Sequence, residues 1–524
     1  MPRRLAALAL FAALFCLGCD PSAPPASTVI YGRGEDANTL DPINTQIGES
    51  VNVILQIFDT LVTYAEDSAE IVPALATKWE HSADGLTWTF DLREDVKFQD
   101  GTPLNAAAVK FSFDRLLQPD HPAVYDKARP YQPNFKMIAE VIPEGEHRVV
   151  FKLSAPSAIF LQNMTMFPAS IVSPTAVEKL KDKFAEQPVG TGPFQMVRWD
   201  RDQKIVLSAF EYHWRGKPKA EHLIFVPVKE SATRIEQLKR GEIHIADNLP
   251  PAELDALAKL PNIVIQEQSG MNVGYLTMQM EKAPFTNANV RKAFALAIDK
   301  ATLIKVAYAG HGAAAVTMVP NTMWAHHQSL ADYPFDPAQA RELLAAAAKE
   351  DGFELPLKIT LAYMNQPRPY MQQPIAVAGF VKDALRDIGV EVTLEPRDVN
   401  EHFKYVDAGK HQLALAGWYS DNADPDNFLY SLLDPDNISE VGNNLSRYRN
   451  EEVHQLLLAG QTELDEAKRL AIYLKVQELV LADVPTIPLI HTNTRVAQSP
   501  KVRGFKLHPT GVLRLRNTYL EGAK

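Results

Sequence analysis

The sequence predicts an α/β protein, because segments with strand periodicity alternate with segments that carry helix signals. Apolar residues recur at every second position in residues 87–93, which follow the turn-forming pair Asp84-Gly85 and suit a strand after a hairpin turn. A cap and a proline, Asp336-Pro337, open a helix over residues 338–349. A strand pattern then returns at residues 390–394. The chain therefore alternates repeatedly between segments with strand periodicity and segments with helix signals.

The other clear elements continue this alternation. Residues 147–153 and 413–417 have strand patterns. One-sided apolar spacing predicts two more helices, one with Val109, Phe113 and Leu116 and one with Phe380, Ala384, Leu385 and Ile388. Asn105 is the N-cap of the first helix, and Gly389 ends the second. These elements are spread along the chain, as expected for a protein of two or three domains.

Composition narrows the class of protein. The chain has 524 residues, of which 46% are hydrophobic, so it can bury large cores and does not need disulfide bonds for stability. Its only two cysteines are Cys16 and Cys19, and the formal net charge is −11. This acidity argues against nucleic acid or an anionic lipid surface as the main partner. No segment after the N-terminal region is long and apolar enough to predict a transmembrane helix.

The N-terminus predicts export. Arg3 and Arg4 precede an apolar run over residues 5–17, which is too short for a stable membrane anchor and suits a signal peptide. The run ends in Leu-Gly-Cys19, which resembles a lipobox, so residues 1–18 are the predicted signal peptide, Cys19 the lipidated residue and residues 19–28 a proline-rich tether. A C-x-x-C redox or metal motif is the alternative, but these cysteines lie in the targeting segment.

Residues 417–428 form the most informative stretch. They continue a strand pattern into Gly417-Trp418-Tyr419-Ser420-Asp421-Asn422-Ala423-Asp424-Pro425-Asp426-Asn427-Phe428. Three aspartates, two asparagines and a proline suit a loop at a strand end, where clefts between lobes usually lie. By composition alone, a surface turn rich in turn-forming residues explains the stretch equally well.

This stretch resembles the cleft segment of bacterial dipeptide-binding receptors, in solute-binding protein family 5. Other segments resemble the family in the same order along almost the whole mature chain: residues 40–42, 75–79, 92–101, 190–194, 212–218, 289–294 and 319–324. The resemblance implies a periplasmic-binding-protein-like fold (type II, cluster C), with two lobes, an extra β-rich domain and a ligand cleft between the lobes.

The family's domain plan gives expected boundaries for this chain. Domain I is expected to combine residues 29–61, 186–275 and 489–524. Domain II is expected to be an insertion over residues 62–185, and domain III to span residues 276–488. Ligand would be held between domains I and III.

A dipeptide receptor must match a zwitterion, because burying either terminal charge unpaired is costly. The resemblance implies that Asp421 binds the α-ammonium group, and that Arg368, in Gln-Pro-Arg-Pro-Tyr, binds the α-carboxylate. Arginine suits that role because its planar fork can bind both carboxylate oxygens. The alternatives are an exposed loop aspartate and a surface arginine in a proline-rich loop.

Five further residues are candidate ligand contacts. Gly417 and Trp418 belong to the motif, and Trp418 offers a flat apolar wall, although a structural tryptophan is an alternative. Gly274 and Tyr275 lie on a strand whose backbone can pair with an extended peptide. Glu49 stands where relatives line the cleft.

We expect no enzyme, because the mature chain has no nucleophilic cysteine and neither an H-E-x-x-H nor a G-x-S-x-G motif. Gly190-Thr191-Gly192 lacks the spacing of a phosphate loop, and the adjacent His326 and His327 point apart, so no cofactor or metal site is predicted. The alternatives are a receptor for haem, a nickel complex, an oligosaccharide or longer peptides on the same fold, or an extracytoplasmic hydrolase.

The resemblance also implies partners and a location. The expected partners are a short peptide and a membrane permease powered by an ABC ATPase, with no nucleic acid partner, and the receptor is expected to be a monomer. The lipid on Cys19 would anchor it at the membrane on the periplasmic side, and Asp20 favours the inner membrane.

Overall fold

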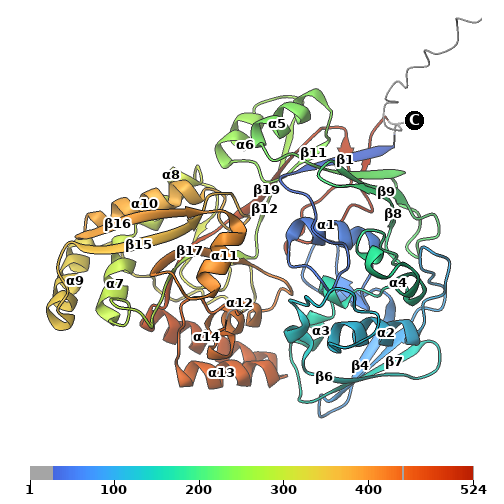
Figure 1. Cartoon of the computed structure of the whole chain (residues 1–524), viewed down its shortest axis with the longest axis horizontal. Coiled ribbons are helices and arrows are strands. Elements are labelled where there is room, and N and C mark those ends of the chain that lie inside the picture. Colours follow the sequence, from blue (N-terminus) through green and yellow to red (C-terminus); the bar gives the residue numbers. More distant parts are fainter. Residues whose placement is uncertain (1–26, 440–441, 523–524) are drawn as a thin grey trace, which may run out of the picture.

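Residues 27–439 and 442–522 are described by a computed structural model of the chain. The predicted signal peptide, Cys19, Asp20 and most of the predicted tether lie outside the described residues. Figure 1 shows two halves that lie side by side, one formed mainly by the yellow to orange part of the chain and the other mainly by the blue to green part. Each half has its own sheet and helices, so the two halves can move relative to each other as rigid bodies.

The blue-to-green half contains a seven-stranded sheet, here called the N-lobe together with helices α1, α4, α5 and α6. Its strands, in spatial order, are β12 (Val264–Ser269), β19 (Asn493–Gln498), β11 (Ile245–Ala246), β1 (Thr28–Arg33), β10 (His222–Pro227), β9 (Lys204–Ala209) and β8 (Phe194–Asp200). The helices are α1 (Gly48–Ile57), α4 (Pro174–Leu180), α5 (Ser231–Arg240) and α6 (Pro251–Leu257). The C-terminal β19 returns to this sheet, so both ends of the described chain belong to one lobe.

A four-stranded antiparallel sheet lies below the N-lobe in Figure 1, and it is called the insertion together with α2 and α3. Its elements are β4 (Ala76–His81), β5 (Thr87–Leu92), β7 (Arg148–Leu153), β6 (Ile138–Pro143), α2 (Ala106–Leu117) and α3 (Phe160–Asn163). Two small ribbons complete this half, β2 (Val62–Tyr64) with β3 (Ile71–Pro73) and β20 (Val502–Arg503) with β21 (Tyr519–Leu520). Aromatic side chains fill the core of the insertion, for example Phe90 against Phe151.

The other half, the C-lobe, is built on a six-stranded mixed sheet. Its strand order is β14 (Ala313–Ala314), β18 (Thr486–His491), β13 (Asn272–Met278), β17 (Leu413–Tyr419), β15 (Leu357–Met364) and β16 (Val390–Arg397). One face packs on α7 (Ala288–Ala297), α8 (Lys300–Ala307), α9 (Pro337–Asp351) and α10 (Pro374–Arg386). The other packs on α11 (Val399–Asp407), α12 (Asp426–Leu433), α13 (Glu451–Thr462) and α14 (Glu466–Asp483). Both faces are covered, which explains the continuous apolar runs in its strands.

The elements expected from sequence are confirmed. The predicted strands are β5, β7, β16 and β17, and the predicted helices are α2, α9 and α10. The Asn105 side chain caps α2 by accepting a hydrogen bond from the backbone N–H of Ala108, and Asp336 caps α9 in the same way. Across the described residues, the helices include none with the length and apolar character that a membrane span requires.

The domain boundaries expected from sequence remain a proposal, although three of them cut through structural units. The boundary after residue 275 falls inside β13, and the boundary after residue 488 falls inside β18. Each boundary therefore divides a strand that belongs entirely to the C-lobe sheet. Residues 172–184, expected in the insertion, include Val177 and Phe184, which pack in the N-lobe core.

The chain crosses between the two large sheets at two places that lie together. β12 leads into β13 through Gly270 and Met271, and β18 leads into β19 through Thr492. Asn272 joins the crossings, because its Nδ2 donates to the Thr492 carbonyl at 3.0 Å and its Oδ1 accepts from the Thr492 backbone N–H at 2.9 Å. This double crossing is the natural hinge between the lobes.

A pair of glycines beside the hinge leaves room for a loop. Gly274 and Gly417 face each other across β13 and β17. A Cβ atom on Gly417 would lie 2.0 Å from Cδ2 of Tyr370, and one on Gly274 would lie 2.5 Å from the Tyr370 carbonyl oxygen. The sheet can therefore seat the Tyr370 segment only because both positions lack a side chain.

Gly417→Ala should destabilise the protein by about 1–3 kcal/mol, because the Tyr370 ring must move from a close-packed seat. Gly379→Ala is the matched control, since this glycine lies within α10 and a Cβ there would meet nothing within 4 Å. The control should be neutral or stabilising by up to about 1 kcal/mol. Urea unfolding measures both changes, and an unchanged stability of Gly417→Ala would contradict the seat.

Candidate functional site

Two loops that follow neighbouring strands bring the main candidate residues to one edge of the C-lobe sheet. β15 and β17 run parallel and are hydrogen-bonded to each other. Arg368 follows the end of β15, and Asp421 follows the end of β17. The carboxyl edge of parallel strands is the usual place for ligands in α/β proteins. The topology thus places the expected cation and anion on adjacent loops.

The Asp421 carboxylate is held from two sides by neutral donors. The Tyr131 hydroxyl, from the connection between α2 and β6 of the insertion, donates to Oδ1 at 2.9 Å. Asn427 donates from Nδ2 to Oδ2 at 3.2 Å, while its own Oδ1 accepts from the Asp421 backbone N–H and from Trp418 Nε1. The motif therefore orients its own carboxylate through Asn427.

No cation of the chain pairs with Asp421 among the described residues, although burial makes its charge costly. Burial raises the pKa of Asp421 to about 6, while the hydrogen bonds from Tyr131 and Asn427 act in the opposite direction. A partly desolvated carboxylate with donors but without a counter-ion is suited to receive a cation from a ligand.

Arg368 projects from a tight turn that is fixed to the hinge. The backbone N–H groups of Arg368 and Met371 donate to each other's carbonyl oxygens at 3.0 and 2.9 Å. Thr492 Oγ1 donates to the Pro369 carbonyl at 2.7 Å, and the Tyr370 ring lies over Gly417. This support limits the conformational entropy that the turn loses when Arg368 binds a partner.

Arg368 is half-buried and faces acidic charge from the opposite lobe. Burial alone would lower its pKa, but the nearby Tyr370 hydroxyl and the Glu49 carboxylate on α1 outweigh burial and raise the pKa above its usual value. Arg368 Nε is buried without a hydrogen-bond partner among the described residues. The guanidinium is therefore charged and has donor capacity left for a ligand carboxylate.

Trp418 and Tyr275 lie on the opposite face of the sheet from the Tyr370 turn. Both line a small cavity of about 30 Å³, together with residues of α11 that include His402 and Asp407. Trp418 is half-buried, so it can also wall a ligand pocket, whereas Tyr275 is only 2% exposed and is part of the C-lobe core. Direct ligand contact by Tyr275, Gly274 and Gly417 remains a prediction, because the side-chain face of the two glycines is occupied by the Tyr370 turn.

The neighbouring aspartates of the motif have structural partners. Asp424 is fully buried and forms a two-point ion pair with Arg469 of α14, with both N–O distances at 2.7 Å. Trp324 lies over the same guanidinium, 5.5 Å from ring centre to Cζ. Burial, and next the charge of Asp424, raise the pKa of Asp426 to about 7. Only Asp421 of the three aspartates accepts a hydrogen bond from the insertion.

Sequence reasoning missed Tyr131, Asn427 and Arg469. Asn427 was within reach, because it lies in the same motif as Asp421. Tyr131 stands between Pro130 and Pro133, a rigid setting similar to that of Arg368, but nothing in the sequence relates it to a residue 290 positions away. Arg469 is one arginine among many in helices, and only packing identifies its partner.

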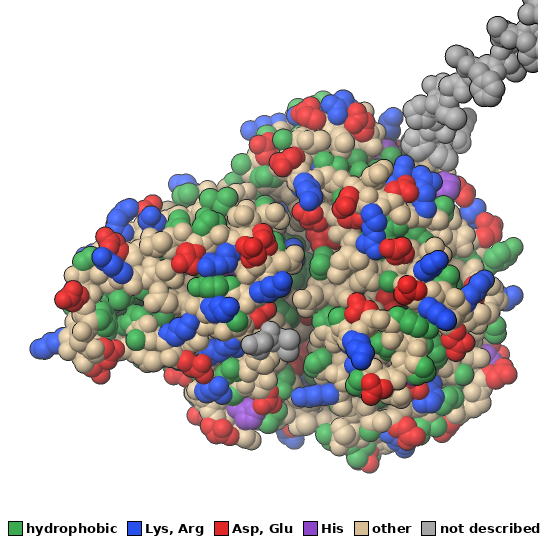
Figure 2. Space-filling model, viewed as in Figure 1, with side chains coloured by type: hydrophobic (Ala, Val, Ile, Leu, Met, Phe, Trp, Pro, Cys, Tyr) green, Lys and Arg blue, Asp and Glu red, His purple; other side chains and the backbone are tan. Residues whose placement is uncertain are grey.

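The two halves touch along their shared furrow. Figure 2 shows this furrow as a narrow hollow between the halves. Within residues 27–439 and 442–522, three hydrogen bonds join the insertion to the C-lobe: Tyr131 to Asp421, Asn422 Nδ2 to Asn163 Oδ1 at 2.7 Å, and the Ala158 N–H to the Gln461 carbonyl at 2.8 Å. The arrangement is a closed one, with Asp421 half-buried at the seam.

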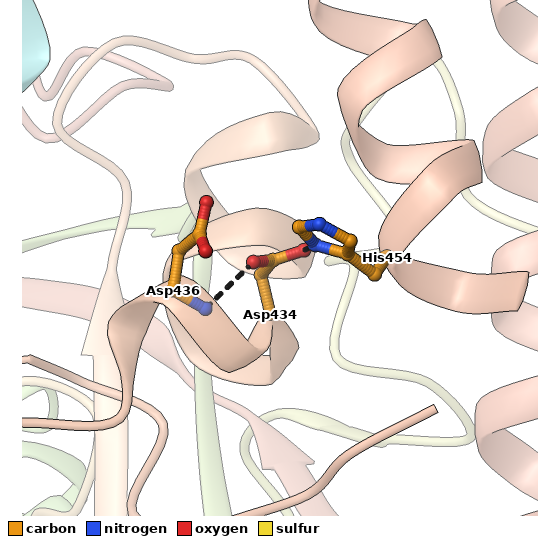
Figure 3. A group of neighbouring side chains, drawn as sticks. All are labelled: Asp434, Asp436 and His454. Carbon is orange, nitrogen blue, oxygen red and sulfur yellow. Dashed lines mark hydrogen bonds and ion pairs between the residues drawn. The ribbon is translucent and has the colours of Figure 1, made fainter. Parts of the chain in front are cut away.

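A separate group in the C-lobe brings Asp434, Asp436 and His454 within reach of a shared ion (Figure 3). The contacts of this group are an ion pair and a hydrogen bond within the chain. Oδ2 of the buried Asp434 lies 2.9 Å from His454 Nδ1, and Oδ1 accepts from the Asp436 backbone N–H at 2.9 Å. The hydrogen bond that His454 donates to the Asp434 carboxylate raises the pKa of His454. The buried carboxylate is thus satisfied by an internal ion pair and a turn hydrogen bond.

Comparison with known proteins identifies the family. Residues 70–440 match the model of bacterial extracellular solute-binding proteins, family 5. The chain therefore belongs to this family, and it is a solute-binding protein with the two-lobed, periplasmic-binding-protein-like α/β fold that the sequence predicts.

Among curated relatives, a dipeptide-binding protein of Pseudomonas aeruginosa is 34% identical over 96% of each chain. Heme-binding protein A of Haemophilus influenzae is 32% identical over 93% of this chain and 91% of that protein. Among solved structures, the periplasmic binding protein DppA of Helicobacter pylori in complex with the peptide STSA has a TM-score of 0.86 and 32% identity, covering 94% of this chain and 98% of that one. The family and these relatives are binding proteins rather than enzymes.

Arg469→Leu should destabilise the protein by about 3–5 kcal/mol, because it leaves Asp424 buried without a counter-ion. The control is Arg449→Leu, which breaks an ion pair with Glu281 whose side chains are 60% and 50% exposed, and which should change stability far less. Urea unfolding at neutral pH compares the two. Equal losses would mean that Arg469 does not depend on its buried partner.

Proposed function

We propose that this protein is the receptor of an ABC importer for short peptides, most specifically dipeptides, and that Asp421 and Arg368 bind the two ends of the ligand. The observation that carries the proposal is the half-buried Asp421 carboxylate, which has two neutral donors and no cation beside it among the described residues. A peptide ammonium group supplies the missing charge. Relatives named as dipeptide-binding proteins support the same ligand class.

The second anchor is Arg368 on the adjacent loop. Its guanidinium can bind the peptide carboxylate through two parallel hydrogen bonds, and its turn is tied to the hinge through Thr492. The Glu49 carboxylate of the N-lobe is close enough to raise the pKa of Arg368, which keeps the guanidinium charged. A ligand with both termini free therefore satisfies two groups that the closed protein leaves without full partners.

The mechanism is capture by closure, without covalent chemistry. The lobes move about the double crossing at Asn272 and Thr492, and ligand bridges the C-lobe anchors to the N-lobe and insertion. Trp418, which is half-buried, offers a flat apolar face to a ligand side chain. The closed, loaded form would then dock on the membrane permease.

We further propose that the protein acts as a monomer that is anchored on the periplasmic side of the inner membrane through lipid on Cys19. The signal-like residues 1–18, the small and proline-rich residues that follow, and Asp20 support this location.

Asp421→Asn and Arg368→Ala should each weaken dipeptide binding by about 2–5 kcal/mol, because each leaves one terminal charge of the buried ligand unpaired. Isothermal titration calorimetry measures the loss. Thermal shift provides the matched ligand control: free dipeptide at a hundredfold excess over Kd adds about 2.7 kcal/mol of stability, and N-acetylated or C-amidated dipeptide should lose most of this gain. Haem, a nickel complex and an oligosaccharide are the comparison ligands. A larger shift from one of them, or unchanged affinity in both variants, would refute the assignment.

Cys19→Ser should move the protein from the membrane fraction to the soluble periplasmic fraction, because it removes the residue that would carry the lipid. Fractionation with mass spectrometry of the N-terminus reads the result, and Cys16→Ser serves as the control that should stay at the membrane. A wild-type protein that is soluble and retains residues 1–18 would contradict the proposal.

A further inference from the structure

Tyr131 reaches the ammonium anchor from another part of the fold. It lies between α2 and β6, and its ring packs edge-on against Phe167, with centroids 5.1 Å apart. Burial, and next the charge of Asp421, raise the pKa of the Tyr131 hydroxyl well above its usual value. The hydroxyl therefore stays protonated and acts as the donor to Asp421 throughout the neutral pH range.

The insertion meets the Asp421 loop at neighbouring points. Asn163, at the end of α3, accepts a hydrogen bond from Asn422, and both side chains are buried. Ala158 donates its N–H to the carbonyl of Gln461, whose side chain in turn donates to Asp426 at 3.2 Å. When the lobes close, the insertion thus has a fixed position relative to the residues that follow β17.

From this geometry we infer that Tyr131 is a positioning residue for the ligand ammonium, which makes the insertion part of the ligand-binding machinery. The inference rests on the proposed function of Asp421. A carboxylate has about four lone-pair sites. Tyr131 fixes one of them and Asn427 another, so the remaining ones keep a single orientation toward the ligand. Without the hydroxyl, the carboxylate has support from one side only.

The other ionisable groups near Asp421 include one tyrosine and the two other aspartates of the motif. Tyr64, on β2, is coupled electrostatically to both Asp421 and Asp424, and burial raises its pKa, so it stays neutral. Asp424 is paired with Arg469, and Asp426 faces Gln461. The hydrogen bonds that oppose the effect of burial on the pKa of Asp421 come from Tyr131 and Asn427.

The pKa of Asp421 predicts how dipeptide affinity depends on pH. Ammonium binding requires ionised Asp421, so dipeptide affinity should be highest above pH 6 and fall about tenfold for each pH unit below the pKa of Asp421, which burial sets at about 6. The Tyr131 hydroxyl lowers that pKa. Its removal should therefore raise the pKa of Asp421 and move the acidic loss of affinity to higher pH.

The test is Tyr131→Phe in the full-length protein, with calorimetric titration of one free dipeptide and its N-acetylated form between pH 5 and pH 8. The variant keeps the ring against Phe167 and loses only the hydroxyl. We expect affinity for the free dipeptide to fall about tenfold at neutral pH, as for other hydrogen bonds to charged groups, with the acidic midpoint displaced upward. The acetylated form should bind wild type and variant equally weakly.

Tyr448→Phe is the matched control, because it removes another buried tyrosine hydroxyl, which donates to Asp483 at 2.6 Å within the C-lobe. It should leave the acidic midpoint of binding unchanged. Asp421→Asn separates the two proposals. If it leaves dipeptide affinity intact, the ammonium anchor itself is wrong.

If Asp421→Asn weakens binding but Tyr131→Phe changes neither affinity nor midpoint, the role of Tyr131 is refuted while the anchor stands. Equal losses for free and acetylated dipeptide in Tyr131→Phe, with no displacement of the midpoint, would also refute it. Such a result would mean that the hydroxyl only supports closure.

Discussion

The position of the Asp421 carboxylate, half-buried at the seam between the two halves, is the constraint around which the candidate site is arranged. In the closed protein the charge has two neutral donors and no cation among the described residues, and burial raises its pKa to about 6. Closure without a ligand therefore leaves the negative charge of Asp421 without a positive partner among the described residues. A ligand with a positive end removes this cost, which couples binding to closure without any chemical step.

The placement of Arg368, the proposed second anchor, depends on backbone geometry rather than on charge. Gly274 and Gly417 are cross-strand neighbours, and the absence of side chains at both lets the Tyr370 segment lie directly on the sheet. Thr492 then ties that segment to the crossing between the lobes. Arg368 is thus held by the same few residues about which the lobes turn, so its guanidinium should keep its place relative to the hinge as the cleft opens and closes.

The three aspartates of the motif show how burial with different partners divides similar residues between stability and binding. Asp424 forms an ion pair with Arg469, and Oδ2 of Asp426 accepts a hydrogen bond from Gln461, whereas Asp421 accepts one from the insertion. All three are short acidic side chains within six positions of a single loop and helix start. What separates them is the element that packs against each one.

The sequence by itself determined the α/β class, the caps of α2 and α9 and the strand that leads into the motif, because periodicity and capping are local properties of the chain. It also named Arg368 and Asp421 as candidates through the family's motifs, while the pairing of β15 with β17 places their loops together. Only the tertiary structure decided that β13 and β18 belong to the C-lobe, that Tyr275 is core, and that Tyr131 meets Asp421 from the insertion. Sheet membership and contacts between residues hundreds of positions apart follow from packing of the whole chain, which leaves no local pattern to recognise.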